Sequence, residues 1–328
     1  MTTDEKYMRR CLQLAYNGRQ NAQPNPMVGA VIVAEGRIIG EGYHVRCGEG
    51  HAEVNAFASV KLKDEYLLPQ ATIYVSLEPC SHYGKTPPCA DLIIKKGVRR
   101  VVVGCVDPFS KVEGRGIQKI KDAGIDVTVG VLEQECKELN KRFMTFNTMH
   151  RPYVLLKWCQ TANGFIDNNY KPFRMSTPFT QMLVHKLRSE YDAIIVGRIT
   201  SERDNPQLNV RYWVGKNPMR LVIDKERPCF EGLDFSKGER NVVCQIVDVL
   251  YKKGVQSLIV EGGAKTLQNF IDLGLWDEIR VETAPMTVPD GTKSPTIHDD
   301  LCLVDREVYE TTTIDTYRRC RESSILES

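Results

Sequence analysis

The feature that most constrains this chain is a set of potential metal ligands in its first third. His51 is followed two residues later by Glu53, and Cys80 and Cys89 come later along the chain. One imidazole nitrogen and two thiolates are ligands that zinc prefers, and three protein ligands leave a fourth tetrahedral position for water. The Glu53 carboxylate is placed to take a proton from that water without binding the metal. A fold of this chain must therefore bring three distant segments together.

The order of these residues follows the signature of the zinc nucleobase deaminases, H-x-E…P-C-x-x-C. The chain departs from it in one respect, because eight residues separate Cys80 from Cys89 where the signature has two. That insertion brings His82 and Lys85 next to the metal on a loop containing Gly and Pro. Two such side chains could bind a phosphate group of the substrate, which a deaminase for a bare base would not need.

Simpler interpretations of these residues also exist. A single cysteine is most often a small apolar residue of the core, although the order of four residues argues against that interpretation for the whole set. A closed structural zinc site would need a fourth ligand, and His82 is the one His or Cys at a suitable spacing. If His82 instead binds the substrate phosphate, no fourth ligand closes the site, which favours an open, chemically active one.

Length and composition indicate a globular protein of two domains. The 328 residues exceed one ordinary core, and 42% are hydrophobic and 26% charged. A net charge of +2 gives little support for nucleic-acid binding. No signal peptide opens the chain and no eighteen apolar residues run together. The 11 cysteines lack framework spacing, which agrees with free thiols in a reducing compartment, so we expect a cytoplasmic protein.

Residues 1–148 alternate between predicted helices and strands. The expected helices cover 3–18, 51–60, 89–96, 114–123 and 133–145, and the expected strands cover 28–34, 37–42, 71–77, 100–105 and 126–130. This order predicts a three-layer α/β/α sandwich with a largely parallel sheet and the metal ligands at one end of it. His51 and Glu53 should then lie in the first turn of a helix.

Residues 149–328 form the second predicted domain, because the helical pattern stops near Pro152. Its expected strands cover 153–161, 192–197, 220–224, 241–247, 257–261, 278–284 and 307–317, and its expected helices cover 178–190 and 265–273. No G-x-G-x-x-G is present. Glu261-Gly262-Gly263 could bring a phosphate to the start of a helix, although a Gly pair after a strand is more often a plain turn.

With its insertion, the first half resembles the bifunctional riboflavin-biosynthesis deaminase/reductase family, which is marked by HAE followed by PCSHxGxTPPC. These motifs read HAE at 51–53 and PCSHYGKTPPC at 79–89. The second half resembles the reductase part of that family in KWCQTANG at 157–164, in 204–211 and in VEGG at 260–263. The resemblance implies a cytidine-deaminase-like domain at 1–148 and a dihydrofolate-reductase-like domain at 149–328. It also implies Zn²⁺ and NADPH as cofactors, and a homo-oligomer.

The resemblance further implies a reaction and its residues. The substrate would be 2,5-diamino-6-ribosylamino-4(3H)-pyrimidinone 5′-phosphate, deaminated hydrolytically and then reduced from a ribosyl to a ribityl chain. In the deaminase half the implied residues are Glu53 as the catalytic residue, His51, Cys80 and Cys89 as zinc ligands, and Asn25, His44, His82 and Lys85 as substrate contacts. In the reductase half they are Lys157, Arg188, Leu208, Arg211 and Glu261 for the substrate, and Cys159, Thr200, Asp204 and Gly263 for NADPH.

Two other functions remain open. The chain could deaminate nucleosides or tRNA with a non-catalytic second half, or it could be a non-catalytic zinc or ligand sensor. Without the resemblance, Asn25 would be a turn residue and Arg211 a surface cation. The short segment between Asp224 and Asn241 and the MTVPDG stretch at 286–291 depart from the family pattern. We therefore assign no residues to the adenine end of NADPH.

Overall fold

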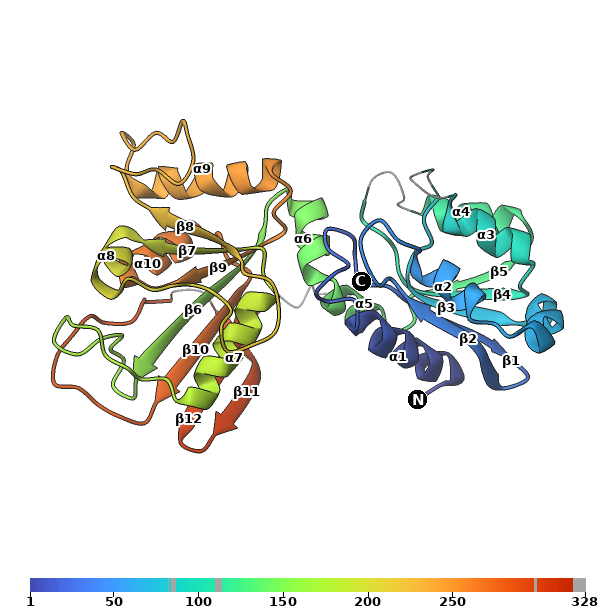
Figure 1. Ribbon diagram of the computed structural model, residues 1–328, viewed down its shortest axis with the longest axis horizontal. Coiled ribbons are helices and arrows are strands. Elements are labelled where there is room, and N and C mark those ends of the chain that lie inside the picture. The colour runs from blue at the N-terminus through green and yellow to red at the C-terminus, as the bar shows by residue number, and fades with distance from the viewer. Residues whose placement is uncertain (82, 84–86, 110–113, 298–299, 321–328) are drawn as a thin grey trace, which may run out of the picture. The chain divides into compact units, whose positions relative to one another are not determined.

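The computed structural model describes residues 1–81, 83, 87–109, 114–297 and 300–320. The chain divides into two compact units, Met1–His150 and Arg151–Ser328, where the sequence suggests a division at 148/149. Each unit has its own β-sheet with helices packed against it (Figure 1). No helix within the described ranges is long and apolar enough to cross a membrane.

The first unit is built on a five-stranded sheet in the order β2-β1-β3-β4-β5. The strands are β1 (Gly29–Ala34), β2 (Arg37–Tyr43), β3 (Thr72–Leu77), β4 (Arg100–Cys105) and β5 (Asp126–Val129). Strands β3, β4 and β5 are parallel, whereas β1 runs antiparallel to both β2 and β3. The sheet is therefore mixed rather than largely parallel, because the β1–β2 hairpin, as predicted, turns on two residues and imposes an antiparallel pair.

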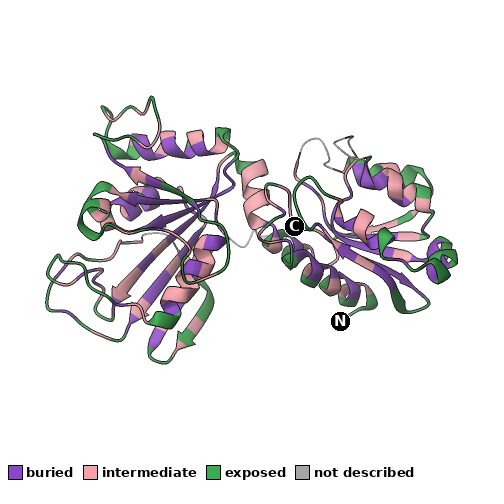
Figure 2. Cartoon of the chain, in the orientation of Figure 1, coloured by how far each residue is buried: buried purple, intermediate pink, exposed green. Residues whose placement is uncertain are grey.

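Helices cover both faces of this sheet, so the predicted three-layer α/β/α sandwich is confirmed (Figure 1). Along β1, Ile32 packs in the core under α2, α3 and α4, and Val31 packs in the core with α1 and α5. Figure 2 shows that buried residues concentrate in the strands: β1, β3 and β4 are almost wholly buried, whereas the edge strands β2 and β5 are partly exposed. The helices are α1 (Thr3–Tyr16), α2 (Ala52–Ala58), α3 (Cys89–Lys96), α4 (Arg115–Asp122), α5 (Glu133–Leu139) and α6 (Lys141–Met149), with a 3₁₀ segment, η1 (Leu62–Gln70).

The second unit contains a seven-stranded sheet in the order β11-β12-β10-β6-β9-β7-β8. The strands are β6 (Tyr153–Thr161), β7 (Ala193–Gly197), β8 (Met219–Ile223), β9 (Ser257–Glu261), β10 (Glu278–Ala284), β11 (Leu301–Tyr309) and β12 (Thr312–Arg319). The five strands from β10 to β8 are parallel, and β11 and β12 add an antiparallel edge. A parallel sheet brings the carboxyl ends of its strands to one edge, which is where open α/β sheets bind ligands.

Two cores hold the second unit together. Helices α9 (Glu239–Lys252) and α10 (Ala264–Asp272) bury the larger core, in which Phe270 and Trp276 are almost fully enclosed. Helix α7 (Pro178–Ser189) covers the other face, and Thr177 caps it in a capping box with Thr180. A short helix that the sequence did not reveal, α8 (Arg198–Asp204), follows β7 directly.

One predicted strand is wrong: residues 241–247 lie in helix α9. The run Asn-Val-Val-Cys-Gln-Ile-Val is rich in β-branched residues, which favour strands. Its buried members, however, recur at helical spacing and continue into the next turn, as Val242, Val243, Ile246, Val247 and Leu250. Packing of this stripe against the sheet overrides the local preference.

Two predicted elements are each divided in the structure. The helix expected at 133–145 breaks at Asn140, whose buried side chain accepts a hydrogen bond from the Met27 N–H (2.8 Å) and donates one to the Met27 carbonyl (2.9 Å). The strand expected at 307–317 is a hairpin that turns at Glu310 and Thr311. Neither residue is a typical turn former, so the sequence carried no signal for it.

The expectation that the cysteines are free holds for nine of them but is wrong for Cys302 and Cys320. Their disulfide joins the start of β11 to the residue that follows β12. The bond closes the antiparallel hairpin at its open end. This hairpin forms the outer edge of the sheet, where strands lack a neighbour on one side.

A substitution in α9 tests its helical packing. Ile246→Ala removes a fully buried side chain and should lower the free energy of unfolding of the second unit by about 2–5 kcal/mol. The matched exposed change, Asp248→Ala, should alter it by less than about 0.5 kcal/mol. Urea unfolding followed by tryptophan fluorescence measures this unit alone, because all three tryptophans lie in it. Equal effects of the two changes would contradict the packing.

Candidate functional site

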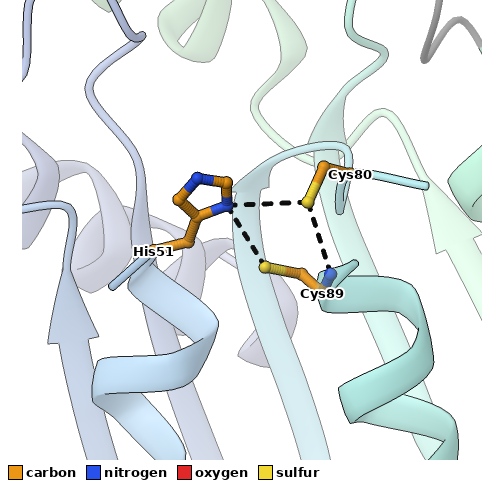
Figure 3. Close-up of side chains that lie close together, drawn as sticks. All are labelled: His51, Cys80 and Cys89. Atoms are coloured by element: carbon orange, nitrogen blue, oxygen red, sulfur yellow. Dashed lines mark hydrogen bonds between the residues drawn. The ribbon is translucent and has the colours of Figure 1, made fainter. Parts of the chain in front are cut away.

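The three predicted metal ligands meet at one point in the first unit. His51 is the N-cap of α2 rather than a residue of its first turn, and its side chain makes no capping hydrogen bond. Cys80 follows the end of β3, and Cys89 is the first residue of α3. His51 Nδ1 lies 3.5 Å from Cys80 Sγ and 3.3 Å from Cys89 Sγ (Figure 3). Three elements distant in sequence therefore direct their ligand atoms inward.

The spacing of these atoms fits zinc. In a tetrahedral site with bonds of about 2.1 Å to nitrogen and 2.3 Å to sulfur, the nitrogen and sulfur ligands are about 3.6 Å apart. The three atoms all lie within 4.8 Å of one another, and in the described part of the chain no fourth His, Cys, Asp or Glu joins them. The arrangement thus provides three protein ligands, as the sequence predicts.

The surroundings favour a thiolate at Cys80. Its hydrogen bond with Cys89 is the largest influence, and together with His51 it lowers the pKa of the Cys80 thiol to about 4 against the effect of burial. The backbone N–H of Cys89, at the start of α3, donates to Cys80 Sγ at 3.3 Å. A helix N-terminus stabilises negative charge, so the fold prepares one sulfur in the form that binds a metal.

Glu53 lies in the first turn of α2 and is 3% exposed. Burial, and secondarily the negative charge of Cys80, raise the pKa of its carboxyl to about 7. A group with a pKa near neutrality can both take up and release a proton at physiological pH. Glu53 therefore has the burial and the acidity expected of a proton carrier beside the metal ligands.

Two of the four predicted substrate contacts lie beside this cluster. The ring of His44 packs edge-on against that of His51, with 5.4 Å between centroids. His44 Nδ1 donates to the Gly50 carbonyl at 3.2 Å, which leaves Nε2 to accept from the Asn25 amide at 3.1 Å. Burial lowers the pKa of His44, which agrees with a neutral ring. The other two, His82 and Lys85, lie outside the described residues.

The second unit has a cavity of about 720 Å³ at the carboxyl ends of β6, β7 and β9. It is lined by most of the residues predicted for the reductase site, namely Lys157, Cys159, Thr200, Asp204, Leu208, Glu261 and Gly263. The two others, Arg188 and Arg211, are not part of the lining. Arg188 Nη2 lies 2.6 Å from Glu261 Oε2, and the backbone N–H of Arg211 donates to His185 Nδ1 at 3.0 Å.

A tight turn shapes one wall of the cavity. Gly262 and Gly263 follow β9 with φ values of 86° and 66°, a left-handed conformation that favours glycine. A Cβ atom on Gly262 would lie 2.9 Å from Thr200 Cγ2, so the turn packs closely on α8. The first amides of α10 follow this turn, as a phosphate-binding site requires.

Several residues that line this cavity were not predicted from the sequence. Arg198, Lys225 and Lys265 add positive charge to its lining. These cations, the glycine turn and the volume together fit an anionic dinucleotide such as NADPH. The sequence could not identify them, because isolated basic residues look like surface residues until the sheet brings them to one cavity.

Sequence reasoning also missed His185, which interacts with Arg188, Arg211 and Glu261. Burial, with the positive charges of Arg188 and Arg211, lowers its pKa to about 4. Although burial opposes ionisation of Glu261, Arg188 and Lys157 hold the pKa of that carboxyl below its ordinary value. The neutral imidazole of His185 thus lies beside the ion pair of Arg188 and Glu261.

Comparison with known proteins finds a matching family for each of the two units. The family model of the cytidine and deoxycytidylate deaminase zinc-binding region matches residues 1–105, and that of the RibD C-terminal domain matches 152–311. Riboflavin biosynthesis protein RibD of Aquifex aeolicus is 38% identical over 319 residues, covering 88% of each chain. The crystal structure of a diaminohydroxyphosphoribosylaminopyrimidine deaminase/5-amino-6-(5-phosphoribosylamino)uracil reductase from Thermotoga maritima shares 34% identity. It has a TM-score of 0.86 and covers 97% of this chain and 99% of its own.

The folds and their sites define a protein in which a zinc-binding deaminase domain precedes a reductase domain. The cytidine-deaminase-like and dihydrofolate-reductase-like folds implied by the sequence are confirmed. The chain belongs to the RibD family of riboflavin biosynthesis proteins and is a bifunctional deaminase and reductase.

The depressed pKa of His185 predicts a pH dependence of stability. Between the ordinary value of 6.5 and about 4, the unfolded chain binds a proton at this position that the folded unit does not. The free energy of unfolding of the second unit should therefore fall as pH is lowered through this window. Glu261, with a lowered pKa, contributes only below about pH 4.5.

Tryptophan-monitored urea unfolding between pH 7 and pH 4.5 measures this effect. His185→Asn removes the titrating group and should flatten the dependence over this range. The wild-type slope retained in the variant would exclude His185 as its source.

Proposed function

We propose that the first unit hydrolytically deaminates 2,5-diamino-6-ribosylamino-4(3H)-pyrimidinone 5′-phosphate and that the second reduces the ribosyl chain of the product to a ribityl chain. The observation that carries the proposal is the convergence of His51, Cys80 and Cys89 beside the buried Glu53, in a chain that also has a reductase domain. The similar Thermotoga maritima protein, which is named as a diaminohydroxyphosphoribosylaminopyrimidine deaminase and 5-amino-6-(5-phosphoribosylamino)uracil reductase, supports the substrate.

In the first step His51, Cys80 and Cys89 would hold zinc, which when bound makes a water molecule acidic enough to attack the substrate at neutral pH. Glu53, with its pKa near 7, takes a proton from the attacking water and transfers it to the departing amine, so that ammonia leaves. Asn25 and the neutral His44 orient the pyrimidine ring. We assign the substrate phosphate to His82 and Lys85.

In the second step NADPH, when bound, supplies the hydride, and the residues of the protein bind and orient the reactants. Thr200, Asp204, Cys159 and the Gly263 turn would contact the cofactor. The phosphorylated substrate would be contacted by the ion pair of Arg188 and Glu261 and by Lys157, Leu208 and Arg211. Pairing keeps the buried charges compensated before the substrate binds.

We further propose small-molecule substrates rather than nucleic acid, a homo-oligomer and a cytoplasmic location. The net charge of +2 supports the first. The exposed apolar side chains of Leu303, Val304 and Val308 on edge strand β11 support the second. The nine free cysteines support a reducing compartment, to which the Cys302–Cys320 disulfide is an exception.

The role of Glu53 is tested by Glu53→Gln, which keeps the shape of the side chain but cannot carry the proton. Ammonia release should fall by about 10²- to 10⁴-fold. Zinc content, and NADPH oxidation with the deaminated intermediate, should remain at wild-type levels. Glu49→Gln, a nearby change at an exposed carboxylate, serves as the control. Deamination that survives in Glu53→Gln would exclude this carboxyl as the proton carrier.

NADPH binding separates a working reductase from an accessory second half. Saturation at about 100 times its dissociation constant should stabilise the tryptophan-containing unit by about 2.7 kcal/mol. Gly262→Ala should reduce this protection, because its added Cβ would contact Thr200. Gly254→Ala is the matched control, since that glycine also has a positive φ but has open space around it.

Both outcomes of that measurement are informative. A wild-type protein without NADPH protection would favour a deaminase of nucleosides or tRNA with a non-catalytic second half. Protection without turnover of the diaminopyrimidine substrate and NADPH would instead favour a sensor.

A further inference from the structure

The buried carboxylate of Glu78 has no role in the proposed reaction, yet it is among the most fully bonded groups in the first unit. Glu78 follows β3, precedes Pro79 and Cys80, and is 4% exposed. It accepts four backbone N–H hydrogen bonds, at 2.9–3.3 Å, from Asp107, Gly114, Gly116 and Ile117. A carboxylate has about four lone-pair positions, so these donors fill them. Glu78 is therefore suited neither to bind a metal nor to carry a proton.

Three of these donors lie at the start of α4. The first N–H groups of a helix have no partner within the helix, and the N-cap residue Gly114 has no side chain to accept from them. Oxygen Oε1 of Glu78 accepts from Gly116 and Ile117, and Oε2 accepts from Gly114. The positive end of the helix dipole also favours a negative group there. Glu78 thus caps α4 from outside the helix.

The same turn of α4 also contacts the main chain next to Glu78. A Cβ atom on Gly116 would lie 1.9 Å from the Pro79 carbonyl oxygen, so the backbones touch and only glycine fits. The start of α3 contacts Cys80 itself. The backbone carbonyl of Cys80 accepts a hydrogen bond from the Ala90 N–H at 3.1 Å, and Cys80 Sγ accepts one from the Cys89 N–H at 3.3 Å. The metal ligand Cys80 is therefore held between the N-termini of two helices.

We propose that Glu78 is a positioning residue, which anchors the segment carrying Cys80 to α4 so that the three ligands stand ready before a metal binds. The inference rests on the proposed zinc site. It differs from a merely structural role, because loss of the anchor should weaken metal binding by more than it weakens the fold. Groups that orient metal ligands typically change metal affinity by about 10- to 100-fold when they are altered.

The test uses the full-length chain with Glu78→Gln. The amide keeps the size of the side chain, but its NH₂ group would face backbone N–H donors, so part of the anchor is lost. Competition with a chromophoric chelator should show zinc affinity reduced by about 10- to 100-fold. The visible absorption of the Co²⁺-loaded protein, which depends on ligand geometry, should also change.

Asp64→Asn is the matched control. Asp64 is another buried carboxylate of the same unit and is bonded to Arg37 Nη2 at 2.7 Å, away from the ligands. It should keep the wild-type zinc affinity and Co²⁺ spectrum even where it lowers the free energy of unfolding. If Glu78→Gln does not fold, zinc affinity and the Co²⁺ spectrum are measured on Glu78→Asp instead. This change keeps the negative charge but shortens the side chain by one methylene, so the same loss of affinity is expected.

The possible results separate the two proposals. Reduced zinc affinity with a changed Co²⁺ spectrum in the Glu78 variant, and neither in the control, supports the positioning role. A Glu78 variant with wild-type affinity and spectrum overturns that role and leaves the zinc site intact. Failure of the wild-type chain to bind zinc would instead overturn the proposed deaminase function.

Discussion

The hydrogen bond from the Cys89 N–H to Cys80 Sγ holds two of the three metal ligands together, and the geometry of the metal site depends on it. It requires the start of α3 to lie against the segment that leaves β3, although eight residues intervene. The parallel pairing of β3 and β4 fixes the position of the end of β3. Helix α3 packs in one core with side chains of β3, so its first residue lies close to that end. The ligand geometry is thus a consequence of helix and sheet packing.

Burial gives this arrangement its chemistry. A carboxylate in water has a pKa well below neutrality, and Glu53 is shifted to about 7 mainly because it is enclosed. The same enclosure would oppose charge on Cys80, yet hydrogen bonds to the sulfur outweigh it. Two neighbouring acids are therefore shifted in opposite directions, which suits one to carry protons and the other to bind a cation. The second unit uses a related device, since Arg188 keeps the buried Glu261 ionised.

The sequence predicted these features where chemistry fixed the residue types. The zinc ligands and Glu53 follow a spacing that few other functions require, and the structure brings the three ligands together. The reductase residues came from the family resemblance alone, and most of them line one cavity at the shared edge of the parallel strands. Asn25 and His44 needed the family resemblance, since neither would stand out among ordinary turn and core residues. Their hydrogen bond and the contact with His51 appear only in three dimensions.

The sequence was least informative where tertiary contacts decide between local alternatives. Residues 241–247 have strand-forming side chains, and only the sheet beneath them selects the helix. Glu78 illustrates the same limit for function. An acidic residue before Pro79 and Cys80 carries no sign that its partners are backbone amides nearly 40 positions away. Backbone donors have no side-chain signature, so a single sequence can identify the residues that react but not those that hold them in place.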